Sequence, residues 1–329
     1  MASSLKIAVT GGTGFIGAHS VRRLLEAGHG VRVLVRSSAA FDRDRGALGA
    51  LGVDRGDVEI VTGDVCDQSA VQDLLDGMDS VLHAAGVVAV DNRNEQHLWD
   101  VNVDATSYVL GQSVRLGLDP IVHVSSYSAM FPSTDPVIGP QSRPVLGSTA
   151  YARTKSVAER IARAFQTAGA PVVITYPSSV IGPPAGDRTG LTSQGWSPVL
   201  KSGWTVSLDG GVALIDVRDV ADLHCAVMEP GRGPRRYMCG GEVVSFDETI
   251  TILAEAAGVE LRRVRATPSM VRAAGTAADV LARIAPVAPI FSREAAAILT
   301  SIQPTDDSAT LAEFGMSWRD ARQSLRESV

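Results

Sequence analysis

A tyrosine and a lysine four positions apart, Tyr151 and Lys155, form the most chemically suggestive pair in this sequence. Lysine is scarce here, since only three of the 30 basic residues, Lys6, Lys155 and Lys201, are not arginine. On a helix, residues four apart share one face, and a neighbouring ammonium lowers the pKa of a phenol from its usual value of about 10. Such a tyrosine can act as an acid or base near neutral pH. The alternative interpretation is a partly buried tyrosine beside a solvated lysine.

The stretch PIVHVSS (120–126) predicts a strand that ends on two serines, Ser125 and Ser126. Open α/β sheets place their ligands at the carboxyl ends of the strands. A serine at that edge can donate a hydrogen bond to a substrate oxygen beside the tyrosine. Two serines after a strand are also an ordinary turn, so the pair alone does not decide between the two interpretations.

The segment TGGTGFIG (10–17) stands where a predicted first strand turns into a first helix. Gly11, Gly14 and Gly17 allow a tight turn, close approach of a pyrophosphate and close packing of the helix on the sheet. The helix N-terminus offers free N–H groups and a favourable dipole to phosphates. The strand before and the helix after the loop favour dinucleotide binding over a plain glycine-rich turn.

The end of the second predicted strand bears on which dinucleotide binds. An acidic residue there would bond the adenosine ribose hydroxyls, whereas an arginine suits a 2′-phosphate. The sequence has Arg36, followed by Ser37 and Ser38, with Arg43 and Arg45 nearby. We therefore expect NADP to be favoured over NAD. The alternative is that Arg36 is one more surface arginine in an arginine-rich chain.

Around these residues, short β-branched runs alternate with helical patterns in the first half of the chain. The predicted strands are 5–10, 31–36, 58–64, 80–85, 120–126 and 171–177. The predicted helices between them are 15–28, 69–77, 95–117 and 150–169. Strict alternation predicts an α/β fold, a doubly wound parallel sheet of the Rossmann type covered by helices on both faces.

After Pro177 this alternation stops. Residues 178–198 are rich in Gly and Pro and predict an irregular connection, and 210–229 predict a strand and helix that return to the first domain. We expect a nucleotide-binding domain made of 1–177 and 212–230. Residues 178–211 and 231–329 then form a smaller, mostly helical substrate-binding cap.

Composition excludes several other classes of protein. The chain of 329 residues is 45% hydrophobic and 20% charged with a net charge of −6 and no basic stripe, so nucleic acid is not an expected partner. Cys66, Cys225 and Cys239 lack metal-ligand spacing, which indicates reduced thiols and no metal site. The sequence shows no secretory signal and no apolar run long enough to span a membrane, so a cytoplasmic location is expected. Residues 270–291 predict an amphipathic helix and a turn, with contact to a membrane surface as the alternative.

The motifs, taken together, resemble the extended short-chain dehydrogenase/reductases, which carry a TGxxGxxG loop and a Ser-Tyr-Lys triad on YxxxK. The match covers about the first 230 residues. The resemblance implies that Ser126, Tyr151 and Lys155 are catalytic and that Asn102, in VNVDAT, supports them. It also implies the following cofactor contacts: Gly11, Gly14, Phe15, Ile16, Gly17, Arg36, Asp64, Val65, Ala84, Ala85, Gly86, Tyr151, Lys155, Pro177, Ser179 and Val180.

Within this family, three features favour reversible carbonyl reduction over sugar-nucleotide epimerisation or dehydration. Arg36 implies NADP, Ser126 is followed by Tyr127 rather than the Asp-Glu of the dehydratases, and the diphosphate-binding arginine of the epimerases falls at about Val212. Residues 216–224 and 305–327 are instead similar to dihydroflavonol reductases, cinnamoyl-CoA reductases and 3β-hydroxysteroid dehydrogenases. The sugar-nucleotide reaction and a non-catalytic NADPH-binding regulator remain the alternatives.

The substrate implied by the resemblance is a small carbonyl or alcohol compound, apolar, aromatic or polycyclic, and the implied assembly is a homodimer through the helices that carry Asn102 and Tyr151. No motif identifies the substrate itself. Met130, Phe131, Trp196 and Trp204 either build an apolar pocket or pack in the core.

Overall fold

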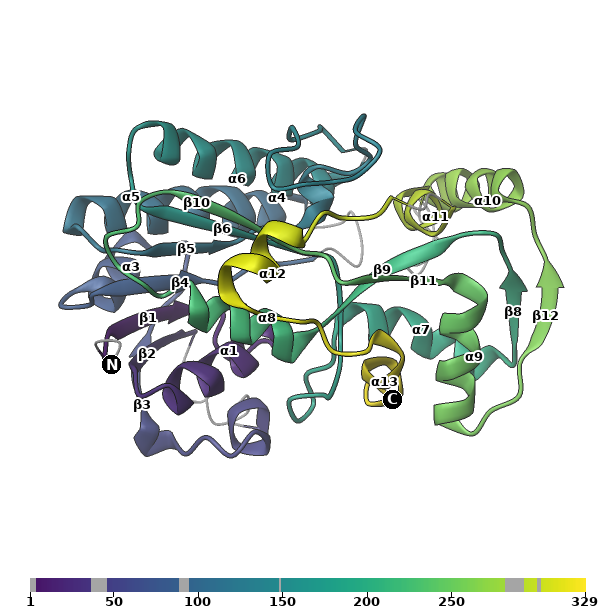
Figure 1. The fold of residues 1–329 in the computed structure, drawn as a ribbon, viewed down its shortest axis with the longest axis horizontal. Helices are drawn as coiled ribbons and strands as arrows, with labels where there is room; N and C mark the ends of the chain where they lie inside the picture. Colours follow the sequence, from purple (N-terminus) through teal and green to yellow (C-terminus); the bar gives the residue numbers. More distant parts are fainter. Residues whose placement is uncertain (1–3, 37–45, 89–94, 148, 282–292, 301–302) are drawn as a thin grey trace.

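A parallel sheet of seven strands in the order β10-β6-β5-β4-β1-β2-β3 forms the larger part of the molecule (Figure 1). The computed structural model describes residues 4–36, 46–88, 95–147, 149–281, 293–300 and 303–329. The strands of this sheet are β1 (Lys6–Thr10), β2 (Gly30–Val35), β3 (Val58–Thr62), β4 (Ser80–His83), β5 (Ile121–Val124), β6 (Val172–Pro177) and β10 (Arg235–Cys239). The predicted Rossmann class is confirmed.

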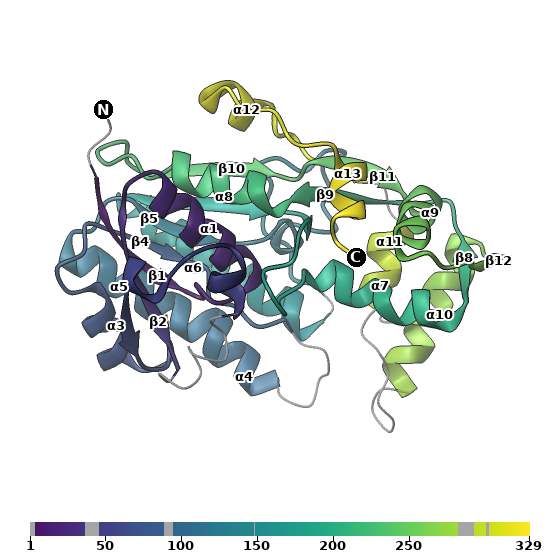
Figure 2. The same ribbon diagram turned by 90° about the horizontal axis from the view of Figure 1, so that it is seen from below.

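Helices cover both faces of this sheet, and each face has its own core (Figures 1 and 2). Ile7, Val9 and Leu82 point toward one face, whereas Ala8 and Val81 point toward the other, as period-two alternation requires. The first core includes side chains of α1 (Phe15–Glu26) and α8 (Val217–Ala226), and the second those of α3 (Gln68–Leu75), α5 (Ala105–Leu116) and α6 (Ala150–Thr167). Burial on both faces explains why the strands are apolar throughout.

The predicted helix over 95–117 is interrupted in the structure. It consists of α4 (Glu95–Trp99), a π-helical turn η3 (Asp100–Asp104) and α5. Asn102 lies within the π-helical turn. Single π turns inside helices are rare and occur frequently at functional sites, so this local departure from regular geometry directs attention to Asn102.

The second half of the chain builds a smaller region around a three-stranded sheet, β11-β9-β7, and a two-stranded sheet, β12-β8. Its strands are β7 (Ser179–Ile181), β8 (Trp204–Ser207), β9 (Gly211–Asp216), β11 (Glu242–Ser245) and β12 (Arg262–Arg265). Its helices are α7 (Leu191–Ser202), α9 (Phe246–Ala257), α10 (Pro268–Leu281), α11 (Arg293–Thr300), α12 (Ser308–Phe314) and α13 (Ala321–Arg326). Two 3-10 turns, η1 (Arg55–Asp57) and η4 (Tyr127–Ala129), are described as well.

One expectation for this half was wrong in detail. Residues 178–198 are not wholly irregular, because they contain β7 and the start of α7. The C-terminal part is mostly helical, as expected, and holds three strands besides its helices. These strands are short and pair with distant segments, so no local alternation marks them. The helix expected within 270–291 is present as the end of α10, while 282–292 lie outside the described residues. None of the helices in the described ranges combines the length and apolarity that a membrane crossing requires.

The chain passes between the two regions more often than the sequence suggests. β9 belongs to the three-stranded sheet, whereas the helix that follows it, α8, packs on α1. β10, from the segment 231–329, completes the seven-stranded sheet by pairing with β6. The division into domains at 177, 212 and 230 stays a prediction.

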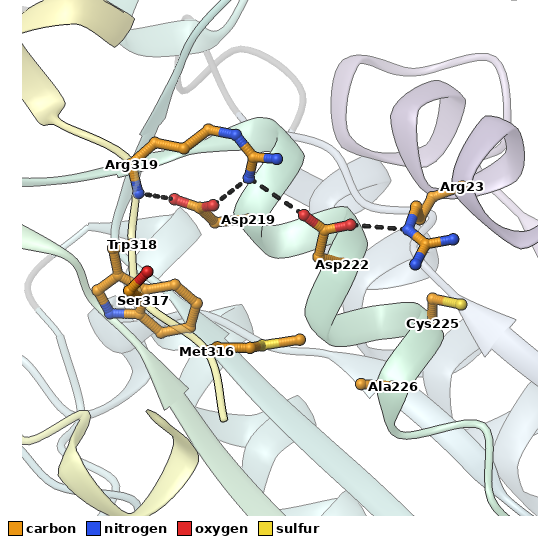
Figure 3. Close-up of a pocket in the computed structure, with 9 residues that line it drawn as sticks. All are labelled: Arg23, Asp219, Asp222, Cys225, Ala226, Met316, Ser317, Trp318 and Arg319. Atoms are coloured by element: carbon orange, nitrogen blue, oxygen red, sulfur yellow. Dashed lines mark hydrogen bonds and ion pairs between the residues drawn. The ribbon is translucent and has the colours of Figure 1, made fainter. Parts of the chain in front are cut away.

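Ion pairs tie the C-terminal segment to the helices of the large sheet (Figure 3). The Arg319 backbone N–H donates to Asp219 Oδ2 at 2.8 Å, and its guanidinium contacts Asp219 and also Asp222, at 3.1 Å. Asp222 pairs in turn with Arg23 of α1 at 2.7 Å. These groups line a pocket together with Cys225, Ala226, Met316, Ser317 and Trp318. None of the residues predicted for the active site lines it, so the network serves to join the chain's last segment to α1 and α8.

Three of the buried histidines, His83, His123 and His224, lie in the large sheet and its helices. Burial lowers the pKa of His83 and of His224 to about 3, and it lowers that of His123 well below its usual value. His83 lies between the Thr10 and Thr106 hydroxyls, at 2.8 and 3.0 Å. Among the residues that the structure describes, neither ring nitrogen of His123 has a hydrogen-bond partner. All three histidines are therefore neutral in the folded protein near pH 7.

We expect these histidines to make the fold sensitive to acid. A lowered folded pKa gives stability that is full above the unfolded value of about 6.5 and is lost as the pH falls below it. At pH 5, each buried histidine should lower the free energy of unfolding by about 2 kcal/mol relative to its value at neutral pH. His123→Leu should narrow the difference in unfolding free energy between pH 7 and pH 5 by about this amount, measured by urea denaturation.

The control for this experiment is Val122→Ala, in the residue next to His123. It removes core contacts but no titratable group, so it should lower the stability equally at both pH values. An unchanged pH difference in His123→Leu would show that the imidazole does not contribute to the acid sensitivity.

Candidate active site

The glycine loop after β1 is packed backbone to backbone. Gly11 has a φ of 71°, and a methyl group added to it would lie 2.6 Å from the Ala85 nitrogen and 2.7 Å from the Ala84 oxygen. A methyl group on Gly17 would lie 2.0 Å from the Gly11 oxygen. The loop thus lies directly against the segment after β4 and against the first turn of α1. Only glycine fits these two positions without displacement of the backbone.

The start of α1 has the chemical character of an anion-binding site. Gly14 is its N-cap, no side chain caps it, and no acidic residue lies in its first turn. The first N–H groups of a helix need an acceptor, and their dipole favours negative charge. Phe15 and Ile16 pack with Val180 in an apolar cluster beside this turn. The residues present therefore fit the pyrophosphate of a dinucleotide.

The residues predicted to select the cofactor lie at one edge of the sheet. Arg36 follows β2 and is exposed, and Asp64 follows β3, the neighbouring strand, and is exposed too. The Asp64 carboxylate accepts a hydrogen bond from the Cys66 backbone N–H at 2.9 Å, which shapes the turn that carries Val65. Ser37, Ser38, Arg43 and Arg45 lie outside the described residues.

The Lys155 side chain of α6 lies close to Asn102 and Gly86, at the carboxyl edge of the large sheet. A methyl group added to Gly86 would lie 3.5 Å from the Lys155 Nζ and 3.5 Å from the Asn102 Oδ1. The Asn102 amide is fixed from both sides, since its Oδ1 accepts from the Val87 N–H and its Nδ2 donates to the Val87 carbonyl, both at 2.8 Å. Its Nδ2 also lies 3.1 Å from the Thr154 hydroxyl. Three of the predicted residues are thus brought together.

The environment of Lys155 changes its protonation. Lys155 is only 8% exposed to solvent. Burial lowers the pKa of Lys155 to about 8, and the charge of Glu159 opposes this shift. The ammonium therefore remains the main form at neutral pH and can still be titrated within the range in which enzymes are assayed.

Tyr151 and Ser126 lie on elements that pack against each other. Tyr151 is half-buried, one turn before Lys155 on α6, whose N-terminus is capped by the Thr149 hydroxyl, which accepts from the Ala152 N–H at 3.2 Å. Ser126, also half-buried, lies two residues after the end of β5 and is the N-cap of η4, which packs on α6. Its Oγ accepts hydrogen bonds from the Ser128 N–H at 3.2 Å and the Ser128 hydroxyl at 2.9 Å. Pro177 is the last residue of β6, the strand next to β5, and Ser179 is the first residue of β7.

Sequence reasoning missed the buried polar groups behind these residues. Glu159 is fully buried and accepts hydrogen bonds from Ser125, Tyr176 and Arg163. The signal for it was the continued four-residue spacing after Tyr151 and Lys155, which places Glu159 on the same face of the helix.

The four candidate substrate residues do not form a common pocket. Met130 and Phe131 are buried in the core of the large sheet, and Trp196 is buried against Phe246 with ring centroids 5.5 Å apart. Trp204, in contrast, is 55% exposed on β8. Core packing is therefore the interpretation that the structure supports for the first three of these residues.

Comparison with known proteins places this arrangement in a family. The model of the NAD dependent epimerase/dehydratase family matches residues 7–240, so the chain belongs to that family. This family lies within the extended short-chain dehydrogenase/reductase superfamily, as the motifs predicted.

Individual relatives share most of the chain. The chain is 28% identical to the sterol demethylase protein B of Methylococcus capsulatus, over 98% of this chain and 96% of that protein. It is 32% identical to a putative dihydroflavonol 4-reductase of Synechocystis, over 76% of this chain and 72% of the relative. Among solved structures, UDP-glucose-4-epimerase from Stenotrophomonas maltophila has the same fold, with a TM-score of 0.75 at 19% identity over 98% of this chain and 96% of that one.

Gly11→Ala should abolish the binding of a nicotinamide dinucleotide. Its methyl group would strain a left-handed backbone and also push against Ala84 and Ala85, which moves the loop from the helix end. The matched control is Gly28→Ala, whose φ is 85° but whose added methyl group would meet nothing within 4 Å. We expect Gly28→Ala to lower the melting temperature but to keep the affinity, measured by NADPH fluorescence titration. Equal affinities for the two variants would contradict the role of Gly11.

Proposed function

We propose that this protein is an NADP-dependent oxidoreductase that interconverts a carbonyl and an alcohol on a small apolar, aromatic or polycyclic substrate. The observation that carries the proposal is the Lys155 ammonium, buried beside Gly86 and Asn102 one helical turn after Tyr151. A desolvated cation in that position stabilises the phenolate form of the tyrosine. The pair therefore suits proton transfer to and from an oxygen at neutral pH.

Three side chains share the chemistry in this proposal. A nicotinamide held at this edge would supply the hydride for the carbonyl carbon in reduction and would accept it in oxidation. Tyr151 donates its proton to the oxygen that becomes an alkoxide, and Ser126 donates a hydrogen bond to the same oxygen as its charge grows. Lys155 would hold the nicotinamide ribose, and its charge lowers the pKa of Tyr151. Asn102, fixed by Val87 and Thr154, holds the polypeptide next to Lys155 in place.

The cofactor would lie across the carboxyl edge of the large sheet. Gly11, Gly14 and Gly17 would hold the pyrophosphate, with Phe15 and Ile16 in the first turn of α1. The other contacts follow the sheet edge from the adenine to the nicotinamide: Asp64, Val65, Ala84, Ala85, Gly86, Pro177, Ser179 and Val180. Arg36, exposed after β2, would pair with a 2′-phosphate, which favours NADP over NAD.

Two relatives support the substrate class. One is named sterol demethylase protein B and is alike over nearly the whole chain, and the other is named a putative dihydroflavonol 4-reductase. Sterols and dihydroflavonols are polycyclic compounds that carry a hydroxyl group. We extend this class to the present chain. We also propose a homodimer through α5 and α6, the helices associated with Asn102 and Tyr151.

Tyr151→Phe should lose most of the turnover but retain NADPH binding, because it removes the proton donor and keeps the ring. NADPH oxidation is followed with a panel of sterol, flavonoid and aromatic ketones, and we expect a decrease in kcat of about 1,000-fold, within the range of effects for a general acid combined with its charge stabilisation. The control is Tyr237→Phe, which should keep full activity. Tyr237 lies on β10, where its hydroxyl donates a hydrogen bond to Glu313 at 2.7 Å.

Two outcomes of this assay would replace the proposal. A 4-keto sugar nucleotide formed without net cofactor consumption would indicate the epimerase/dehydratase reaction. NADPH binding without any turnover on the panel would favour a non-catalytic regulator.

Arg36→Asp should weaken NADPH binding by at least 10-fold and leave NADH binding nearly unchanged, because it replaces the partner of the 2′-phosphate with a like charge. Loss of a charged hydrogen bond worth about 1.5 kcal/mol corresponds to a change in affinity of this size. The control is Arg22→Asp, which changes the net charge of the protein by the same amount but lies on the exposed surface of α1. Equal affinity of the unmutated protein for NADPH and NADH would refute the NADP preference.

A further inference from the structure

A row of charged residues continues the Tyr151–Lys155 spacing along α6. Glu159 and Arg163 follow at intervals of four, so each of the four side chains neighbours the next one along the helix. Glu159 is 0% exposed, whereas Arg163 is half-buried. A carboxylate that is completely removed from water requires strong partners, since its desolvation otherwise costs several kcal/mol.

The partners of Glu159 come from two strand ends of the sheet. The Ser125 hydroxyl of the β5 end donates to Oε2 at 2.8 Å. The Tyr176 hydroxyl of β6 donates to Oε1 at 2.6 Å, and the Arg163 Nε donates to the same oxygen at 2.6 Å. Ser125 immediately precedes Ser126, and Tyr176 immediately precedes Pro177. One carboxylate thus connects α6 to the residues before the proposed catalytic serine and before the proposed nicotinamide contact.

The geometry points to Glu159 as a positioning residue that fixes the ends of β5 and β6 against α6 and keeps the neighbouring Lys155 ammonium charged. The inference rests on the proposed function of Tyr151, Lys155 and Ser126. Glu159 itself does not touch substrate or cofactor in this scheme. It acts through Ser125 on the strand end and through its charge on Lys155.

The electrostatic part follows from the groups that face Lys155. From the sheet, His83 of β4 and His123 of β5 face it, and both are held neutral by burial, with their pKa values lowered. From its own helix, the titratable neighbours of Lys155 are Tyr151, one turn before it, and Glu159, one turn after it. The charge of Glu159 favours the ammonium and opposes the burial that lowers the pKa of Lys155 to about 8. Arg163 and Tyr176 lie on the other side of Glu159, where they neutralise part of its charge.

Two substitutions should move the titration of Lys155 in opposite directions. Glu159→Gln keeps the shape of the side chain and removes its charge, so the pKa of Lys155 should fall by about 1 unit, at the lower end of the effect of a close opposite charge. Arg163→Met removes the cation that neutralises Glu159, so the pKa of Lys155 should rise. Ser125→Ala removes a hydrogen bond but no charge and should leave this pKa unchanged.

The titration can be measured without any substrate. The chain has only three lysines, so protein labelled with ¹³C at the lysine ε-carbon gives three signals, and Lys155→Arg identifies the one from Lys155. The full-length protein is titrated by NMR from pH 6 to pH 10. If Glu159→Gln does not fold, the rise in Arg163→Met still tests the inference. An unchanged Lys155 pKa in either folded variant overturns the electrostatic role.

The pH profile of NADPH-dependent reduction provides the second measurement. If the charged form of Lys155 is required, kcat/KM falls as the pH rises through the pKa of Lys155, and Glu159→Gln should move this fall about 1 unit lower. Its activity should then be about 10-fold below the unmutated protein at pH 9 but similar at pH 6. A uniform loss at all pH values would show a merely structural role. If the NMR titrations shift as expected but no substrate is turned over, the electrostatic effect of Glu159 on Lys155 would be supported and the proposed function would be refuted.

Discussion

The desolvation of one ammonium group is the constraint around which the candidate site is built. Lys155 must be close to the sheet edge to lie beside Gly86 and Asn102, and this position removes it from most of the surrounding water. Burial alone favours the neutral amine. The neighbouring elements oppose this tendency in different ways: the histidines behind Lys155 carry no charge, and a carboxylate lies one turn further along the helix. The same burial makes the lysine responsive to small changes around it.

The nucleotide-binding half could be predicted from the sequence because its signals are local. The strands up to 177 are short apolar runs, most of them followed by a helix with three- and four-residue spacing, and the glycine loop lies between the first two elements. The second half could not be predicted in this way. β7 is only three residues long and pairs with β9, and β12 is a run of exposed residues, Arg262–Arg265, without any apolar alternation. Their pairing depends on partners far away in the sequence.

The residues of the candidate site likewise differ in how far the sequence predicts them. Residues at turns, such as Gly11 and Ser126, are recognisable because a particular backbone or strand end requires them. Glu159 and His83 are buried polar groups whose partners come from other elements, Ser125 and Tyr176 for the first and Thr10 and Thr106 for the second. A sequence does not show which buried polar groups meet, and only the fold makes their hydrogen bonds visible. The π-helical turn at Asn102 was likewise hidden within a regular helical pattern.

The packing of α8 on α1 also constrains how the protein is made. The apolar side of α1, with Ala18, Val21 and Leu24, is covered in part by Leu223 and Val227, which lie some two hundred positions later. During synthesis the early βαβ units therefore leave the ribosome with this surface still open, and the sheet still lacks its edge strand β10. Exposed apolar surface on a nascent chain is a target for chaperones and a source of aggregation. Efficient production of this protein thus depends on protecting its first two thirds until the remainder has been translated.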